Sequence, residues 1–365
     1  MDRRQFLGVS AALVALPSQA AVPSLSSFVA GQIAGTDFGG SVLISSGGQI
    51  VLRTGTGVAD RSFGVPCAAE TVYRIASITK LMTATIVMQL VDDGRIALDQ
   101  PIATYLPDYK GAGAKQVLIR QLLNHTSGIE NFDKGLTSYA DAAAKGIPAY
   151  QLPHTPRELM DEFASGPLVH PPGTAFDYNN GDYVILGQII QTVEGEPYEA
   201  VLARRVLAAS GMTTTGMDVG TKIIPRLAPT YYKDDKQPLA KDMPVYGQNW
   251  YAAGGLYSTC DDLLKFSNAL YGGRLISEKS LRALLSPGLD EYGFSQWVST
   301  LDVGGRKHRF AQRPGRIMGT NTLLLRMLDD DVTIIILGNT NLVDTDHLGF
   351  QIARHILSSG QTIAH

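Results

Sequence analysis

The segment that most constrains the fold runs over residues 81–91, where nearly every residue is apolar or a small threonine or alanine. A helix that is hydrophobic on nearly every face belongs in a protein core. Ser77 and Lys80 stand just before this segment, and residues three apart lie on one helical face. Lys80 is therefore predicted to be buried, which is rare for a lysine without polar partners. The sequence predicts a core helix that carries a serine beside an amine.

A second polar group lies far downstream, after a Pro-Pro-Gly turn at residues 171–173. Tyr178 and Asn180 alternate on a segment predicted to be extended, so both side chains can reach one pocket. A buried ammonium group has three protons to donate, and the Ser77 hydroxyl, the Tyr178 phenol and the Asn180 carbonyl are predicted to accept them. Because a serine becomes a good nucleophile only beside a base, this grouping indicates an acyl-transferring serine enzyme. The alternative is a Lys80 that extends to solvent and an ordinary half-buried Tyr178.

Four motifs follow one another along the chain. They are residues 73–80 (Tyr-Arg-Ile-Ala-Ser-Ile-Thr-Lys), 122–129 (Leu-Leu-Asn-His-Thr-Ser-Gly-Ile), 171–180 (Pro-Pro-Gly leading to Tyr-Asn-Asn) and 253–256 (Ala-Gly-Gly-Leu). In these motifs the sequence resembles the superfamily of serine β-lactamases and penicillin-binding proteins, especially its branch of class C β-lactamases, D,D-carboxypeptidases and esterases. The resemblance covers most of the chain after residue 35.

The third catalytic element departs from this family. Family members carry Lys or His, a small residue and Gly on a strand that lines the pocket, whereas this chain has Arg313, Pro314 and Gly315. Arg313 offers planar donors suited to a carboxylate, but it cannot exchange a proton at any working pH. We therefore expect Arg313 to bind substrate. Pro314 lacks an N–H and is predicted to lie at a sheet edge or a bulge.

The resemblance implies two-step acyl transfer with Ser77 as the nucleophile. Lys80 and Tyr178 are expected to share its proton, and which of them is the acylation base stays open. The oxyanion is expected to lie between the backbone N–H groups of Ser77 and Arg316. The substrate-binding residues implied are Asn180, Arg313, Gly315 and Arg316.

The expected substrate is a small molecule or a peptide, and no cofactor or metal is predicted. A β-lactam, a D-amino-acid peptide and an ester all stay open. Because the third element is altered, a penicillin-recognising binding protein with little turnover is the alternative to a hydrolase.

Other chemistries have little support in the sequence. It contains no Gly-x-Ser-x-Gly elbow of an α/β-hydrolase, no His-Glu-x-x-His or Cys-x-x-Cys spacing and no phosphate-binding loop. His125 lies in the second motif, where we expect it to make structural hydrogen bonds. The chain has 31 Lys and Arg against 34 Asp and Glu and contains no basic run, so the sequence gives no sign of a nucleic-acid-binding surface.

The N-terminus has the features of an export signal. Arg3 and Arg4 precede a modest apolar stretch over residues 7–16, and small residues end at Ala20. This pattern predicts a signal peptide over residues 1–20, of the twin-arginine or the ordinary secretory type. The mature chain is therefore expected to be periplasmic or secreted, without a stable membrane span. Its two cysteines, Cys67 and Cys260, are expected to be buried thiols, although a bond between them stays open.

The predicted fold is of the α/β (α+β) class. Strand patterns occur near both ends of the chain, at residues 41–45, 49–53, 322–327 and 332–337. Helical patterns cover residues 24–34, 77–92, 117–123, 156–163, 182–193, 198–209, 261–270, 278–285 and 345–357. We expect one antiparallel sheet built from both termini and flanked by helices (residues 21–70 and 246–365), with an inserted all-helical lobe (residues 71–245). The β-lactamase-like family has this architecture, and its active site lies between the two lobes.

Overall fold

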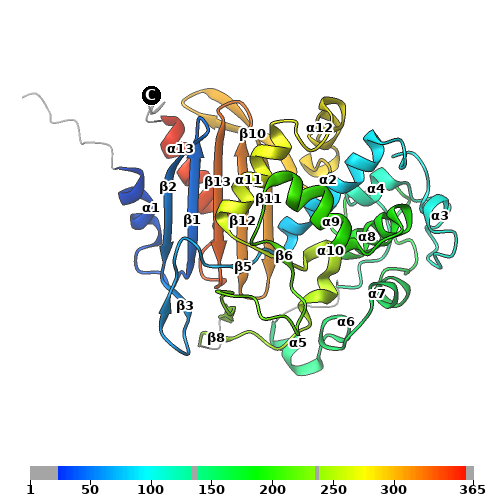
Figure 1. Cartoon of the computed structure of the whole chain (residues 1–365), viewed down its shortest axis with the longest axis horizontal. Coiled ribbons are helices and arrows are strands. Elements are labelled where there is room, and N and C mark those ends of the chain that lie inside the picture. Colours follow the sequence, from blue (N-terminus) through cyan, green and yellow to red (C-terminus); the bar gives the residue numbers. More distant parts are fainter. Residues whose placement is uncertain (1–23, 134–138, 235–237, 359–365) are drawn as a thin grey trace, which may run out of the picture.

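A six-stranded antiparallel sheet joins the two ends of the chain (Figure 1). The computed structural model describes residues 24–133, 139–234 and 238–358. The strand order is β10-β11-β12-β13-β1-β2, so β1 (Gly40–Ser46) lies between β2 (Gln49–Thr56) and β13 (Val332–Gly338). The first hairpin therefore pairs with the last strand, which confirms the predicted sheet built from both termini.

The remaining strands of this sheet come from the C-terminal third of the chain: β10 (Trp297–Val303), β11 (Arg306–Ile317) and β12 (Thr320–Met327). Shorter strands lie outside it: β3 (Val58–Asp60), β4 (Val65–Pro66), β5 (Tyr73–Arg74), β6 (Gly216–Met217), β7 (Tyr231–Tyr232), β8 (Ala240–Lys241) and β9 (Leu256–Ser258).

Helices cover both faces of the sheet. On one face α13 (Thr345–Ser358) packs against β12 and β13 and contacts α1 (Leu25–Ile33), and on the other α11 (Cys260–Tyr271) packs against β1 and β13 (Figure 1). Successive residues of β12 alternate between the two cores, with Leu323 on the side of α13 and Leu324 on the side of α11. Strands buried on both faces read as continuous apolar runs, which explains the composition of β12 and β13.

The chain between β5 and β9 is mainly helical. Its helices are α2 (Thr79–Asp92), α3 (Ile102–Tyr105), α4 (Ile119–Leu123), α5 (Tyr139–Lys145), α6 (Pro148–Gln151), α7 (Pro156–Phe163), α8 (Asn180–Glu194), α9 (Tyr198–Leu202) and α10 (Tyr251–Gly254), with α12 (Glu278–Leu284) following α11. Short 3-10 helices are η1 (Ala76–Ile78), η3 (Gly247–Trp250) and η4 (Leu289–Glu291), and the π-helix η2 (Ala203–Ala208) replaces the end of the helix predicted over residues 198–209.

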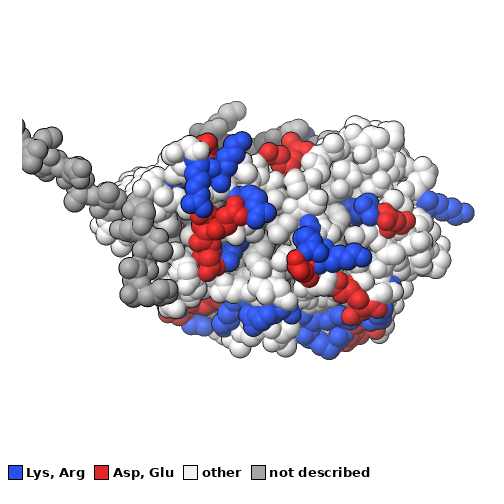
Figure 2. Space-filling view, turned by 90° about the horizontal axis from the view of Figure 1, so that it is seen from above, with Lys and Arg blue, Asp and Glu red and all other residues white. Residues whose placement is uncertain are grey.

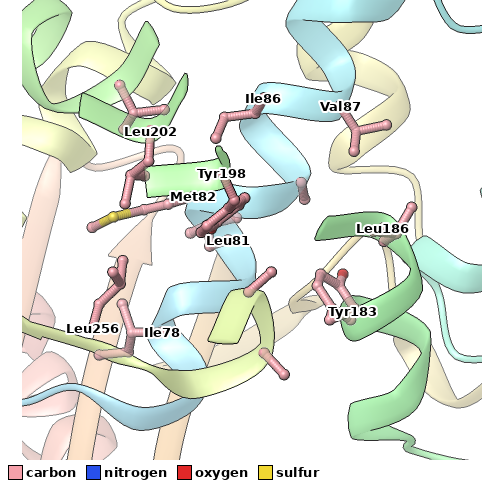
Figure 3. Packing of buried hydrophobic residues seen from close by; sticks show 14 of the residues in the cluster. Ile78, Leu81, Met82, Ile86, Val87, Tyr183, Leu186, Tyr198, Leu202 and Leu256 are labelled. Atoms are coloured by element: carbon pink, nitrogen blue, oxygen red, sulfur yellow. The ribbon is translucent and has the colours of Figure 1, made fainter. Parts of the chain in front are cut away.

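Helix α2 is the centre of the main hydrophobic core (Figure 3). Its apolar side chains meet residues of α8, α9 and β9, and the labelled contacts are Ile78, Leu81, Met82, Ile86, Val87, Tyr183, Leu186, Tyr198, Leu202 and Leu256. Burying a large aliphatic side chain contributes about 1.5–3 kcal/mol. This packing confirms the predicted core helix and holds its first turn in a fixed place.

The predicted thiols are also confirmed, because Cys67 and Cys260 are both buried and unbonded. Among the described residues, no helix combines the length and the apolar character needed to cross a membrane. Basic and acidic side chains are interspersed over the face shown in Figure 2. The predicted signal peptide, residues 1–20, lies outside the described residues, and the limits of the two lobes stay a prediction.

Candidate active site

Ser77 and Lys80 meet at the start of the core helix. The backbone turns sharply there, since Ala76 has a φ of 46°, a conformation uncommon for a residue with a side chain. The helix predicted from Ser77 accordingly begins as η1 and becomes α-helical at Thr79. Lys80 Nζ lies 3.0 Å from Ser77 Oγ, and Lys80 is fully buried. A hydroxyl and an amine are thus held together by local helix geometry.

Two further acceptors complete the surroundings of the Lys80 amine. It donates to Asn180 Oδ1 at 2.8 Å and to the carbonyl oxygen of Ala253 at 2.7 Å. The predicted acceptors Ser77 and Asn180 are confirmed. Lys80 Nζ also lies over the Tyr178 ring, 5.0 Å from its centroid, and the phenol oxygen points to Ser77. The sequence analysis did not predict the contact with Ala253, although Ala253 belongs to the 253–256 motif.

Tyr178 approaches the serine from the opposite direction. Its hydroxyl donates to Ser77 Oγ at 2.9 Å, so the serine oxygen lies between an amine and a phenol. Asn179 caps helix α8 by accepting the N–H of Gly181 at 2.8 Å. This cap fixes the start of the helix at Asn180, so that Tyr178 lies just before it. The Tyr178 ring packs on buried His125, with centroids 4.3 Å apart.

His125 itself has the structural role expected from the sequence. Its Nδ1 lies 3.0 Å from Asp182 Oδ2 and also accepts the N–H of Asn179. These contacts support the turn behind Tyr178.

Arg313 is buried at the back of the site, with only 1% of its surface exposed. Its guanidinium donates to the Tyr178 hydroxyl at 2.5 Å, to the Tyr292 hydroxyl at 2.7 Å and to the carbonyl oxygens of Ser295 and Ser77 at 3.0 and 2.8 Å. Four of the five N–H donors of an arginine side chain are thus engaged within the protein. These contacts indicate that Arg313 acts directly on Tyr178, and the carboxylate-binding role expected from the sequence is the alternative.

The end of β11 forms one wall of the site. β10 pairs with β11 only as far as Gln312, whereas β12 pairs with it through Ile317. Pro314 therefore lies where β11 has a neighbour on one side alone, which confirms the predicted edge position. A side chain at Gly315 would meet the Ile75 carbonyl oxygen at 2.4 Å and the Ser77 nitrogen at 3.1 Å. Gly315 thus permits the strand to approach the serine turn closely.

A small cavity of about 160 Å³ opens onto the nucleophile. It is lined by Ser77, Tyr178, Trp297, Arg313, Pro314 and Arg316. The Arg316 side chain donates to Asp346, with 2.6 Å between Nη2 and Oδ2. Trp297, whose ring stacks on Tyr178 with centroids 6.4 Å apart, was not predicted because nothing in its local sequence distinguishes it.

Burial and charge bring the two candidate bases to similar proton affinities. Burial, assisted by Arg313, lowers the pKa of Lys80 to about 8, although Tyr178 opposes this shift. Burial alone would raise the pKa of Tyr178, but Arg313 and Lys80 lower it to about 8. Groups coupled this closely titrate as a pair. A proton can therefore pass between the serine and either base near neutral pH.

Metal chemistry has no candidate residues here: within residues 24–133, 139–234 and 238–358, no group of three or more His, Cys, Asp or Glu could hold an ion. The site consists of a serine, an amine, a phenol, an amide and a guanidinium. These groups can perform nucleophilic and proton-transfer chemistry by themselves.

Comparison with known proteins agrees with this chemistry. The sequence model of a family described as Beta-lactamase matches residues 29–355. PbpX of Bacillus subtilis, provisionally named as a penicillin-binding protein, is 29% identical over 263 residues, or 72% of this chain. The chain spans 62% of that relative, less than two thirds of its length.

Two further proteins match over nearly their whole length. Esterase EstB of Burkholderia gladioli is 26% identical over an alignment of 345 positions, which covers 83% of this chain and 86% of the esterase. The crystal structure of D-amino acid amidase from Ochrobactrum anthropi, complexed with L-phenylalanine amide, superimposes with a TM-score of 0.76 at 25% identity. The superposition covers 92% of this chain and 99% of the amidase.

Proposed function

Because the chain belongs to the β-lactamase family of serine hydrolases, we propose that it hydrolyses an ester or amide bond through an acyl-enzyme on Ser77. One observation carries this proposal. Ser77 Oγ is hydrogen-bonded by both Lys80 Nζ, at 3.0 Å, and the Tyr178 hydroxyl, at 2.9 Å. A serine between two groups with pKa values of about 8 has a place to send its proton when it attacks a carbonyl carbon.

Two groups can accept the proton of the Ser77 hydroxyl. With neutral Lys80, two N–H bonds go to Asn180 and Ala253 and the lone pair faces Ser77. With Tyr178 as a phenolate, Arg313 stabilises its charge and Lys80 keeps all three protons. In either case the base takes the serine proton and the bond between Ser77 Oγ and the carbonyl carbon forms. The bond between that carbon and the leaving-group oxygen or nitrogen then breaks, and the same proton passes to the leaving group. Water then attacks the acyl-enzyme by the reverse route.

The developing oxyanion needs donors in place before the reaction. We propose the backbone N–H groups of Ser77 and Arg316, since both residues line the cavity and Gly315 brings the two segments together. Removing one such donor typically costs about 10²–10³ in rate.

Ester and amide substrates are both favoured by the names of relatives, since EstB is an esterase and the Ochrobactrum protein an amidase. The test is turnover by the purified protein of a chromogenic cephalosporin, a p-nitrophenyl ester and peptides ending in D-Ala-D-Ala. Hydrolysis of any one supports the proposal. A stable penicilloyl adduct without turnover of any would instead indicate a penicillin-recognising binding protein. We also propose export from the cytoplasm, on the basis of the signal peptide predicted over residues 1–20.

Replacing Tyr178 with phenylalanine should lower the acylation rate about 100-fold, because it removes the phenol and leaves the ring packed on His125. The melting temperature should change little. Stopped-flow measurement of acylation with a p-nitrophenyl ester checks this. Tyr105→Phe is the matched control, since Tyr105 lies in α3 and its hydroxyl accepts the N–H of Ala97. A Tyr178→Phe enzyme with the wild-type acylation rate would leave Lys80 as the base alone.

The value of kcat/KM should rise with pH as the base loses its proton, and replacing Arg313 with methionine should move this rise to higher pH. Arg313 lowers the pKa of Tyr178, so its removal raises that pKa, and the phenolate then forms only at higher pH. The fall in kcat/KM at pH 7, roughly ten- to a hundredfold for a lost charge-assisted hydrogen bond, should be equal for neutral and carboxylate-bearing esters. A pH profile with both substrates checks this. A selective loss of the carboxylate-bearing ester would establish Arg313 as a substrate-binding residue.

A further inference from the structure

A buried carboxylate lies directly behind the catalytic amide. Asp133 Oδ2 accepts a hydrogen bond from Asn180 Nδ2 at 2.6 Å, and both Asp133 oxygens lie 3.0 Å from the Tyr150 hydroxyl. The other end of the Asn180 amide accepts from Lys80. Only one amide group therefore separates this carboxylate from the catalytic amine.

Among the described residues, the side chains that donate hydrogen bonds to Asp133 are neutral. Within the described part of the chain no ion pair includes it, and its two neutral donors leave part of the capacity of a carboxylate, which can accept about four hydrogen bonds. Burial raises the pKa of Asp133, although Asn180, Tyr150 and Lys80 oppose this shift. A charge held in such a place is stabilised by a cation that also donates hydrogen bonds.

Asp133 also lines a cavity suited to an apolar group. The cavity has a volume of about 320 Å³ and is lined by Asn180 and by Arg316, which also lines the cavity at Ser77. Beyond the carboxylate its wall is made of Trp250, Met243, Ile317 and Met318. Tyr150 and Trp250 stack with centroids 4.5 Å apart, which makes this wall rigid. One negative group at the edge of an apolar cavity matches a ligand with one cationic and one apolar group.

We propose that Asp133 binds the ammonium group of the substrate, and that the substrates are esters or amides of apolar α-amino acids, or peptides with a free N-terminus. The amine has to be close to the scissile carbonyl, because Asp133 is joined to Lys80 through Asn180 alone. The apolar side chain then enters the cavity beside Trp250. This inference rests on the proposed function, since it names the substrates of the Ser77 acyl-enzyme.

Three methyl esters with one ring system test the proposal: phenylalanine methyl ester, its N-acetyl derivative and methyl 3-phenylpropanoate, with both enantiomers of the first two. The released acid is titrated at pH 7, where an α-amino group with a pKa of about 7.7–8.0 is protonated. The wild type should prefer the free amine over both neutral esters in kcat/KM. Asp133→Asn keeps the size and an oxygen acceptor but removes the charge. It should lower this preference roughly ten- to a hundredfold, the effect of a charge-assisted hydrogen bond.

Asp141→Asn is the matched control. It removes the same charge from neighbouring helix α5, where Asp141 lies 3.4 Å from Lys145 Nζ, and it should leave the preference within about twofold, as expected for an exposed ion pair. An equal fall in kcat/KM for all three esters in Asp133→Asn would overturn the proposal, because Asp133 would then only position Asn180.

The wild type alone also decides the question, should Asp133→Asn fail to fold. If it hydrolyses methyl 3-phenylpropanoate as well as the free amine, the ammonium site is refuted while the acyl-enzyme stands. If no ester yields acid and no acyl group appears on Ser77, the proposed function fails and this inference with it.

Discussion

Replacement of Ser77 with alanine should abolish both turnover and covalent labelling by a fluorophosphonate or a penicillin. The expected fall in kcat is about 10⁴–10⁶-fold, because loss of a serine nucleophile removes the covalent route and leaves only binding and oxyanion stabilisation. Ser77 Oγ accepts from Lys80 and Tyr178, and alanine leaves the fold of η1 unchanged. Intact-protein mass spectrometry followed by peptide mapping measures the label, and the wild type should carry it on the peptide that contains Ser77.

Ser62→Ala serves as the control for this experiment. Ser62 is exposed in the turn between β3 and β4, and its loss should leave the label and the turnover at wild-type levels. A label on any residue other than Ser77, or turnover that survives in Ser77→Ala, would refute the assignment of the nucleophile.

Replacement of Lys80 with methionine should lower the acylation rate about 10³-fold. Methionine fills most of the lysine volume, but it can neither take the serine proton nor hold Asn180 and the Ala253 carbonyl. General-base groups typically contribute 10²–10⁴-fold. Two buried acceptors lose their donor, so the melting temperature should also fall, with a loss of about 1–3 kcal/mol for each unsatisfied group. Single-turnover kinetics and thermal unfolding measure the two effects.

The matched control is Lys110→Met. Lys110 is exposed and lies 3.4 Å from Asp161 Oδ2, so its loss should change stability by at most about 1 kcal/mol and leave acylation intact. A folded Lys80→Met enzyme with near-normal acylation would show that Tyr178 and Arg313 activate the serine without the amine.

The order of these effects tells the two bases apart. If Lys80→Met lowers acylation far more than Tyr178→Phe, the neutral amine takes the proton. The opposite order indicates the phenolate held by Arg313. Since the pKa values of Lys80 and Tyr178 are both about 8, the double variant should fall less than the product of the single effects, as expected for groups that act as a unit.

Features set by short stretches of chain were predicted well from the sequence. The helix over residues 156–163 agrees with α7 (Pro156–Phe163), whose Thr155 and Glu158 form a capping box. The two predicted hairpins, β1–β2 and β12–β13, also depend on residues close together in the chain, as does the contact of Ser77 with Lys80. Local hydrogen bonding and hydrophobic periodicity decide such features, so they can be read before the fold is known.

The sequence by itself thus determined the contact of Ser77 with Lys80, the core helix and the sheet built from both ends. Only the tertiary structure decided the surroundings of these groups. Arg313, Ala253 and Asp133 reach the site from β11, from α10 and from the chain before α5, and no periodicity links them to Ser77. The reason is physical: a guanidinium binds a carboxylate from solvent or a phenol in the core according to its burial, and burial depends on how distant segments pack.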